Sequence, residues 1–314
     1  MKTILHLLIV FGFLVCNSSH AETIRISFLN DSGVLKETTE LLKKSGCRND
    51  GVAAFRKAVE RYYSIPFELD LSKFPQVQHG FYSFQSSTQI LALLPHALRL
   101  TPHPWEFNCF DTVIVASAGQ LQVSLSPNDI SGVFLAPQMT TNFALLNLPV
   151  ATARDAFDFS VPAWYREVSQ GFIPKSMIDA RINLIAALYG NYVLPASTTE
   201  DKLNDAVLST LRVNWKRQAI TFPAKFEVIS CHAVHLPSHQ FTTLHAGLLF
   251  TLSKGYSYLE KDSGNGPFVR LDFDNKSDLV AWLSSKFDRQ ENEGGRYRFA
   301  TFNDTKIEAL RLDH

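Results

Sequence analysis

The chain lacks several features that reveal a protein's class from sequence. It has no excess of either charge, because 30 Lys and Arg side chains balance 30 Asp and Glu side chains. It also contains no long basic run, no low-complexity tract and no internal repeat. A chain without net charge has no global attraction to nucleic acid or to an anionic membrane surface. We therefore expect no nucleic-acid partner.

Well-known catalytic and phosphate-binding motifs are also missing. The sequence has no Gly-rich phosphate loop, no Gly-x-Ser-x-Gly motif and no His-Glu-x-x-His motif. We therefore predict no cofactor. Beyond the first 21 residues, no stretch reaches the ~18 unbroken apolar residues that a membrane helix needs. We expect no integral membrane segment once those first residues are removed.

The N-terminus has the pattern of a secretion signal. A positive charge at Lys2 precedes an apolar run over residues 4–15, and Ser19-His20-Ala21 places small residues at the cleavage positions. We expect residues 1–21 to be a signal peptide and the mature chain to be exported. The sequence does not distinguish the periplasm from the cell exterior.

Cysteine is scarce, with four in the chain. Cys16 lies in the signal peptide, and Val15 before it argues against a lipoprotein, whose signal has Gly, Ala or Ser there. Cys47, Cys109 and Cys231 remain, and an odd number in an exported protein implies at least one free thiol or an intermolecular bridge. A Cys47–Cys231 disulfide would leave Cys109 free, but the sequence does not establish that pairing.

Apolar periodicity predicts an α+β fold in a single domain over residues 22–314. Helical spacing dominates the first part, and alternating spacing dominates from residue 224 onward. Between them, a segment of about 147–217 has the character of a helical insertion or lid. The expected helices are 33–44, 52–63, 174–190, 200–217 and 278–287, and the expected strands are 22–29, 225–236, 244–252, 256–261 and 268–273.

Cys109 is the candidate nucleophile. It follows Asn108 at what is predicted to be the start of a buried helix, although the β-branched run at 112–115 is also compatible with a buried strand. The N-terminus of a helix favours a thiolate, and its N–H groups can bind an oxyanion. A packed, unreactive thiol is the alternative interpretation.

His245 is the candidate general base, predicted at the start of a strand. With the hairpin turn near Ser253-Lys254, position 245 falls opposite positions 260–262 of the next strand. Glu260 is the expected carboxylate partner and Asp262 the alternative, because a register shift of one residue reverses the face. A thiol, an imidazole and an orienting acceptor are the minimum parts of a cysteine hydrolase.

A second cluster favours a different class of protein. Cys231, His232, His235 and His239 lie within nine residues and resemble a metal site. In a strand, however, neighbouring residues face opposite sides, and no pair here has a recognised zinc spacing. Our preferred prediction therefore assigns no residue as a metal ligand. Metal binding through these four side chains is kept as an alternative function.

Several blocks resemble a family of secreted bacterial proteins of unknown function, over residues 22–116 and 225–290. The most specific block is His245-Ala-Gly-Leu-Leu-Phe250 followed by Gly255-Tyr-Ser-Tyr-Leu-Glu-Lys261. The other matching blocks are Phe28-Leu-Asn-Asp-Ser, Thr38-Thr-Glu-Leu-Leu-Lys-Lys-Ser-Gly46, Phe55-Arg-Lys-Ala-Val-Glu, Asn108-Cys109, Gly266-Pro-Phe, Phe273-Asp-Asn-Lys and Asp278-Leu-Val-Ala-Trp-Leu-Ser-Ser-Lys-Phe-Asp288.

That family is in turn similar to the NlpC/P60-like papain superfamily, which has Cys at a helix start, His opening a strand and a polar residue on the next strand. Cys109, His245 and Glu260 match those places. The resemblance implies a papain-like fold and a thiol-dependent amidase or peptidase, with bacterial cell-wall peptide or another amide or ester as substrate. A non-catalytic envelope binding or scaffold protein on the same fold is the alternative.

Overall fold

The computed structural model describes most of the chain. The described residues are 24–64, 70–94, 108–123, 133–134, 148–149, 184–262, 266–288, 296–303 and 305–306. The predicted signal peptide, the larger part of the predicted helix at 174–190 and much of the predicted insertion at 147–217 lie outside them.

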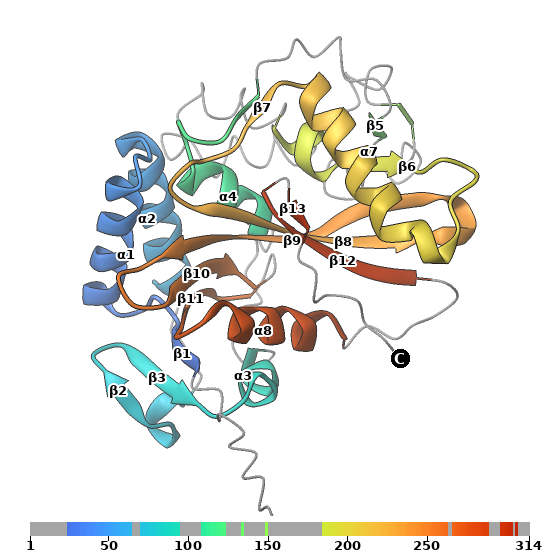
Figure 1. The fold of residues 1–314 in the computed structure, drawn as a ribbon. Helices are drawn as coiled ribbons and strands as arrows, with labels where there is room; N and C mark the ends of the chain where they lie inside the picture. The colour runs from blue at the N-terminus through green and yellow to red at the C-terminus, as the bar shows by residue number, and fades with distance from the viewer. Residues whose placement is uncertain are drawn as a thin grey trace, which may run out of the picture.

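A large antiparallel sheet forms the centre of the fold (Figure 1), with the order β13-β12-β8-β9-β10-β11-β1-β3-β2 and with β6 and β5 joined beside β9. A separate pair is formed by β4 (Gln122–Val123) and β7 (Ile220–Thr221). The strands of the large sheet are β1 (Ile24–Ser27), β2 (Gln76–Gln78), β3 (Phe81–Phe84), β5 (Val133–Phe134), β6 (Asn191–Val193), β8 (Glu227–His235), β9 (Gln240–Thr251), β10 (Tyr256–Lys261), β11 (Phe268–Phe273), β12 (Arg296–Phe302) and β13 (Thr305–Lys306).

Helices cover both faces of this sheet (Figure 1), so its central strands are buried on two sides. On β9 and β10, Leu248 and Leu259 face one core, while Leu249 and Tyr258 face the other. The first core is shared with α1 (Ser32–Lys44), α2 (Asn49–Tyr63), α4 (Cys109–Ala116) and α7 (Leu203–Arg217), and the second with α3 (Ser87–Leu93) and α8 (Lys276–Asp288).

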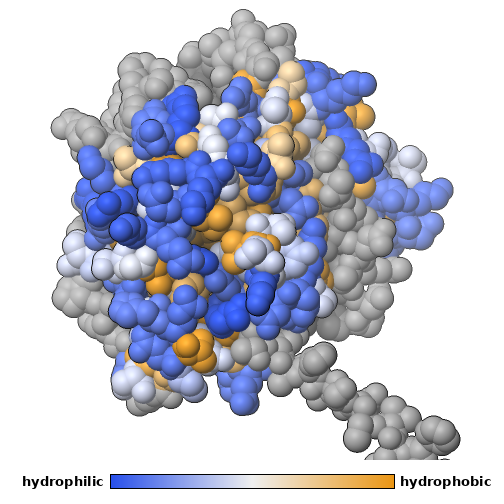
Figure 2. All heavy atoms as spheres, turned by 60° about the vertical axis from the view of Figure 1, so that its left-hand side comes forward, coloured by the Kyte–Doolittle hydropathy of each residue, from blue (hydrophilic) through white to orange (hydrophobic). Residues whose placement is uncertain are grey.

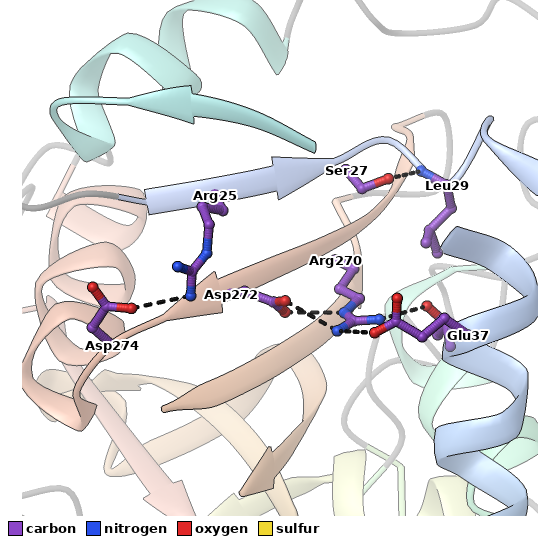
Figure 3. Close-up of polar contacts among 8 residues, drawn as sticks. Arg25, Ser27, Leu29, Glu37, Arg270, Asp272 and Asp274 are labelled. Atoms are coloured by element: carbon purple, nitrogen blue, oxygen red, sulfur yellow. Dashed lines mark hydrogen bonds and ion pairs between the residues drawn. The ribbon is translucent and has the colours of Figure 1, made fainter. Parts of the chain in front are cut away.

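An ion-pair network ties the first helix to the sheet (Figure 3). The guanidinium of Arg270 on β11 is buried and bonds both carboxylate oxygens of Asp272, each at 3.0 Å. The same group lies 3.0 Å from the Glu37 carboxylate on α1. The bidentate pair within β11 fixes the orientation of the guanidinium, and the single ion pair with Glu37 connects it to α1.

The long strand β9 changes partners along one edge. Gly247 pairs with Glu260 of β10, whereas Phe241 pairs with Tyr192 of β6. Among the described residues, the interval 242–246 has no strand on that edge. A β-bulge also lies here, because Cys231 and His232 of β8 are opposite His245 and Thr243, which leaves Leu244 without a counterpart. Bulges commonly redirect a side chain near a functional site.

The structure confirms the mixed class of helices and antiparallel sheet. The run 109–116 is helical, and the predicted helices at 33–44, 52–63 and 200–217 are found within a few residues of their expected ends. The helix over the β-branched run is favoured by a capping box at its first turn, in which Asn108 and Asp111 bond each other's backbone N–H groups.

One expectation about the sheet was wrong, and several strands were not predicted. β9 begins at Gln240, so His245 lies inside the strand and not at its start. The sequence analysis did not predict β2, which pairs with β3. β12, which no pattern revealed, pairs with β8 along its length. Alternation is weak in all three regions because both faces are covered or because the strand is short.

The face that carries α1 and α2 is mostly hydrophilic, with smaller hydrophobic areas between (Figure 2). Among the described residues, the exposed large apolar side chains are Val77 on β2, Leu148, Val193 on β6 and Val213 on α7. In the described part of the chain, no helix has the length and apolar content needed to cross a membrane.

A buried histidine links β8, β9 and the helical residues 184–189. The Thr243 hydroxyl donates to the Leu188 carbonyl at 3.1 Å, so its oxygen accepts from His232 Nδ1 at 3.0 Å. His232 Nε2 is 3.4 Å from the Thr301 hydroxyl. Burial lowers the pKa of this imidazole to about 3, so the ring is neutral in the folded protein near neutral pH.

We predict that His232 makes the protein less stable in mild acid. In the unfolded chain the imidazole has its ordinary pKa of ~6.5 and binds a proton below that pH, whereas in the folded protein it stays neutral. Stability is therefore lost as the pH falls. Between pH 6.5 and 4.5, the free energy of unfolding should decrease more steeply in the wild type than in His232→Asn. The difference in slope should be on the order of 1 kcal/mol per pH unit. Denaturant titrations at several pH values measure this, and equal slopes would contradict it.

Candidate active site

Cys109 is the first residue of α4, directly after the cap residue Asn108. Asn108 Oδ1 accepts from the Asp111 N–H at 2.9 Å, and Asp111 Oδ2 accepts from the Asn108 N–H at 3.2 Å. These bonds leave the N–H groups of Cys109 and Phe110 as the two first-turn donors that the capping box does not use. Both lie next to the thiol.

His245 and Glu260 form a short hydrogen bond between neighbouring strands. His245 Nε2 is 2.5 Å from Glu260 Oε2, and the carboxylate is fully buried. Glu260 is paired with Gly247 in the ladder, so it reaches His245 diagonally across the hairpin. Glu260 is the carboxylate that we expected to orient the imidazole.

Lys286 of α8 completes a chain of charges behind Glu260. Its ammonium donates to Glu260 Oε1 at 2.8 Å and lies 3.0 Å from Asp262 Oδ1. Asp262, the alternative partner for His245, thus pairs with Lys286. A buried carboxylate needs this kind of compensation, because an unpaired charge in the interior costs several kcal/mol.

The pKa values of the three charged groups reflect this arrangement. Burial opposes the charged form of Glu260, but the charges of Lys286 and His245 lower its pKa to about 2. Burial and Lys286 disfavour the imidazolium of His245, yet Glu260, together with the charge of Cys109 and a hydrogen bond to it, raises its pKa to about 9. Burial opposes the charge of Lys286, and Asp262 and Glu260 outweigh it and raise the pKa.

The thiol and the imidazole are in contact. His245 forms a side-chain hydrogen bond with Cys109, and α4 packs against β9 and β10. Since Nε2 is bonded to Glu260, Nδ1 is the ring nitrogen that faces the thiol. Cys109 is 5% exposed and His245 is 4% exposed, so the pair is shielded from bulk water. The structure therefore brings together all three residues that the sequence analysis selected.

The second cluster is dispersed. Cys231 is buried in the core beneath α8, and His232 bonds two threonines on the other face of β8. His235 instead bonds Ser238. Within the described ranges, no group of three or more His, Cys, Asp or Glu side chains is placed to hold a metal ion. Strand alternation, which the sequence analysis raised against this site, accounts for the separation.

The Cys47–Cys231 disulfide, which the sequence allowed, is not formed. Cys47, Cys109 and Cys231 are all free and buried thiols. Cys47 belongs to the core on the α2 side of the sheet and Cys231 to the core on the α8 side. The sheet lies between them.

Sequence reasoning missed Lys286. Its signal was present in the helical spacing of α8, where Leu279, Trp282 and Leu283 are fully buried. Position 286 continues that stripe at i+4 from Trp282. A lysine on the buried face of a helix implies a buried anion, and the nearby hairpin supplies two.

Residues 176–307 match a family model described as "Domain of unknown function (DUF4300)". The matched range contains His245, Glu260 and Lys286, while Cys109 precedes it. No curated protein matches the chain, and no solved structure does. The papain-like relationship inferred from the sequence thus stays a prediction.

We predict that Lys286→Met destabilises the protein by about 3–5 kcal/mol, because it removes the cation that Glu260 Oε1 and Asp262 share. Lys276→Met is the matched control, since Lys276 pairs with Glu227 at 3.1 Å but both side chains are about one-third exposed. That change should cost about 1 kcal/mol or less. Chemical denaturation of both variants tests the difference, and equal losses would refute a special role for the Lys286 pair.

Proposed function

We propose that the protein is an exported thiol-dependent hydrolase, an amidase or peptidase. Cys109 is the nucleophile, His245 the general base and acid, and Glu260 the residue that orients His245. The observation that carries the proposal is the continuous bonded series Cys109–His245–Glu260, with the thiol at a helix N-terminus. These are the parts, in the order, that nucleophilic catalysis by cysteine requires.

The proposed reaction runs in two halves. The Cys109 sulfur attacks the substrate carbonyl carbon, and the negative charge moves to the carbonyl oxygen, where the N–H groups of Cys109 and Phe110 stabilise it. His245 then gives its proton to the departing amine or alcohol, which leaves a thioester on Cys109. In the second half His245 takes a proton from water, which attacks the thioester and releases the acid.

The electrostatics favour an ion pair in the resting site. With its pKa raised to about 9, His245 is protonated at neutral pH. An imidazolium beside the sulfur stabilises a thiolate, which is the reactive form of cysteine. Glu260 holds the imidazolium in place and is itself kept ionised by Lys286.

Bacterial cell-wall peptide is the leading substrate, and this part of the proposal rests on the family resemblance described above together with the signal peptide. A binding or scaffold protein on the same fold would need the same buried residues only for stability. The two functions differ in the reactivity of the thiol, which is therefore the property to measure.

We predict that iodoacetamide alkylates Cys109 at pH 6–7 much faster than it alkylates Cys47 or Cys231. The three thiols are 5%, 6% and 3% exposed, so access is matched and a difference in rate reports the electrostatic environment. Burial raises the pKa of Cys47 to about 12, which makes it an unreactive internal control. Mass spectrometry of digested protein gives the rate at each site.

The same measurement on His245→Ala and Glu260→Gln tests the ion pair. Both changes should slow the alkylation of Cys109 near pH 6, the first by removing the imidazolium and the second by removing the charge that sustains it. A Cys109 that reacts no faster than Cys231 would support the binding protein instead.

Hydrolysis itself is tested on purified bacterial peptidoglycan, with released fragments separated by liquid chromatography. Cys109→Ala should abolish fragment release while leaving the thermal unfolding curve nearly unchanged, and Cys231→Ala should retain activity. Full activity in Cys109→Ala would remove the thiol from the mechanism. If the wild type releases nothing but alkylates as predicted, the substrate class is wrong and the site assignment stands.

A further inference from the structure

Tyr189 is a fully buried tyrosine next to Cys109. Its side chain is 0% exposed, and its ring packs on that of Phe110, the residue after the nucleophile, with ring centroids 4.3 Å apart. Its hydroxyl has no hydrogen-bond partner among the described residues. A buried hydroxyl without a hydrogen-bond partner costs roughly 1–3 kcal/mol of folding stability, so this group destabilises the folded protein.

The position of Tyr189 is fixed by three separate elements. The carbonyl of Ala187 accepts from the Tyr192 hydroxyl of β6 and from Trp215 Nε1 of α7, the latter at 3.2 Å. The carbonyl of Leu188 accepts from the Thr243 hydroxyl of β9 at 3.1 Å. The backbone immediately before Tyr189 is therefore bound to two strands and a helix.

The next residue adds a close contact. A Cβ atom at Gly190 would lie 2.2 Å from Val133 Cγ1 and 3.0 Å from the Ala186 carbonyl oxygen. Only glycine permits this approach of β5 to the end of the helical residues 184–189. The tyrosine is thus held on both sides along the chain.

Charged groups of the site also affect the pKa of the Tyr189 hydroxyl. Burial raises the pKa of Tyr189 well above its ordinary value, and the charges of Cys109 and Asp111 raise it further. The phenol is therefore protonated at neutral pH and can donate a hydrogen bond.

We propose that Tyr189 is a third oxyanion donor, which gives its hydroxyl hydrogen bond to the substrate carbonyl oxygen as Cys109 attacks. This inference rests on the proposed hydrolase function and adds a catalytic residue to it. The ring of Tyr189 packs on the side chain of Phe110, whose N–H group would bind the same oxygen, and the charge of Cys109 acts on the phenol. The unmet hydrogen bond in the resting protein is then satisfied only when the oxyanion forms, which is the condition for selective stabilisation of the transition state.

Acylation and alkylation of the same thiol separate this role from a structural one. 4-Nitrophenyl acetate acylates a thiolate through a tetrahedral oxyanion, whereas iodoacetamide alkylates it by direct displacement of iodide and forms no oxyanion. In Tyr189→Phe, acylation of Cys109 should slow by roughly 10²-fold, while alkylation of Cys109 should keep the wild-type rate. Release of 4-nitrophenolate and the mass of the Cys109 peptide follow the two reactions.

Tyr192→Phe is the matched control. Tyr192 is also a fully buried phenol, but its hydroxyl is bonded to the Ala187 carbonyl. Because Trp215 Nε1 also donates to that carbonyl, Tyr192→Phe should lower thermal stability while changing the ratio of acylation to alkylation far less than Tyr189→Phe does. Tyr189→Phe should have equal or higher stability than the wild type, because it removes a polar group without a partner. Tyr189→Met repeats the test with a second side chain that lacks the hydroxyl.

The outcomes are distinct. If the wild type is acylated at Cys109 and Tyr189→Phe is acylated equally fast, Tyr189 is not a donor and the hydrolase proposal stands. If both reactions slow together, the hydroxyl acts on the thiolate and the oxyanion role is overturned. If Cys109 of the wild type reacts with neither reagent, the hydrolase proposal fails and this inference fails with it.

Discussion

The buried carboxylate of Glu260 is the group on which the rest of the site depends. It is fully removed from water, and each of its oxygens meets a cation, His245 on the strand beside it and Lys286 on the helix beneath it. Neither cation could be removed without leaving an uncompensated charge in the interior. The carboxylate therefore constrains two parts of the structure. The helix α8 must lie where Lys286 can reach the hairpin, and the His245 ring must point one nitrogen at Glu260 and the other at the thiol. The bonds that stabilise Glu260 are thus the bonds that orient His245.

The strand β9 organises the remaining parts through its break in pairing. One side of the break is bounded by β10 and the other by β6, and the bulge at Leu244 separates His245 from Thr243. His245 contacts Cys109, and Thr243 fixes the backbone that carries Tyr189. A single strand thus orients both the proposed general base and the proposed oxyanion donor from positions two residues apart. His232 supports this arrangement from β8, which gives a buried histidine outside the site a clear purpose.

Local patterns were enough to predict the class of fold and to select three residues that the structure brings into contact. The capping sequence around Cys109 and the hairpin containing His245 and Glu260 are short-range signals, because turn length and alternation fix a hairpin register. The catalytic roles of the three residues stay a prediction. Lys286 and Tyr189 were missed for a common reason. Each becomes significant only through contacts with segments far away in sequence, a lysine meeting a carboxylate on another element and a phenol meeting a helix start. The β12 strand escaped notice likewise, since its pairing with β8 is a tertiary choice and not a local preference.

The place of β1 has a consequence for the order in which the protein assembles. This strand lies between β11 and β3, with Ile26 opposite Leu271 on one side and Tyr82 on the other. Its pairing with β11 spans most of the chain and carries a high loop-closure cost, whereas the hairpins from β8 to β11 close locally. Chain synthesis starts at the N-terminal end, so β1 is made early and must wait without this partner until the residues of β11 exist. The pairing of β1 with β11 is therefore expected to be among the last in the sheet to form.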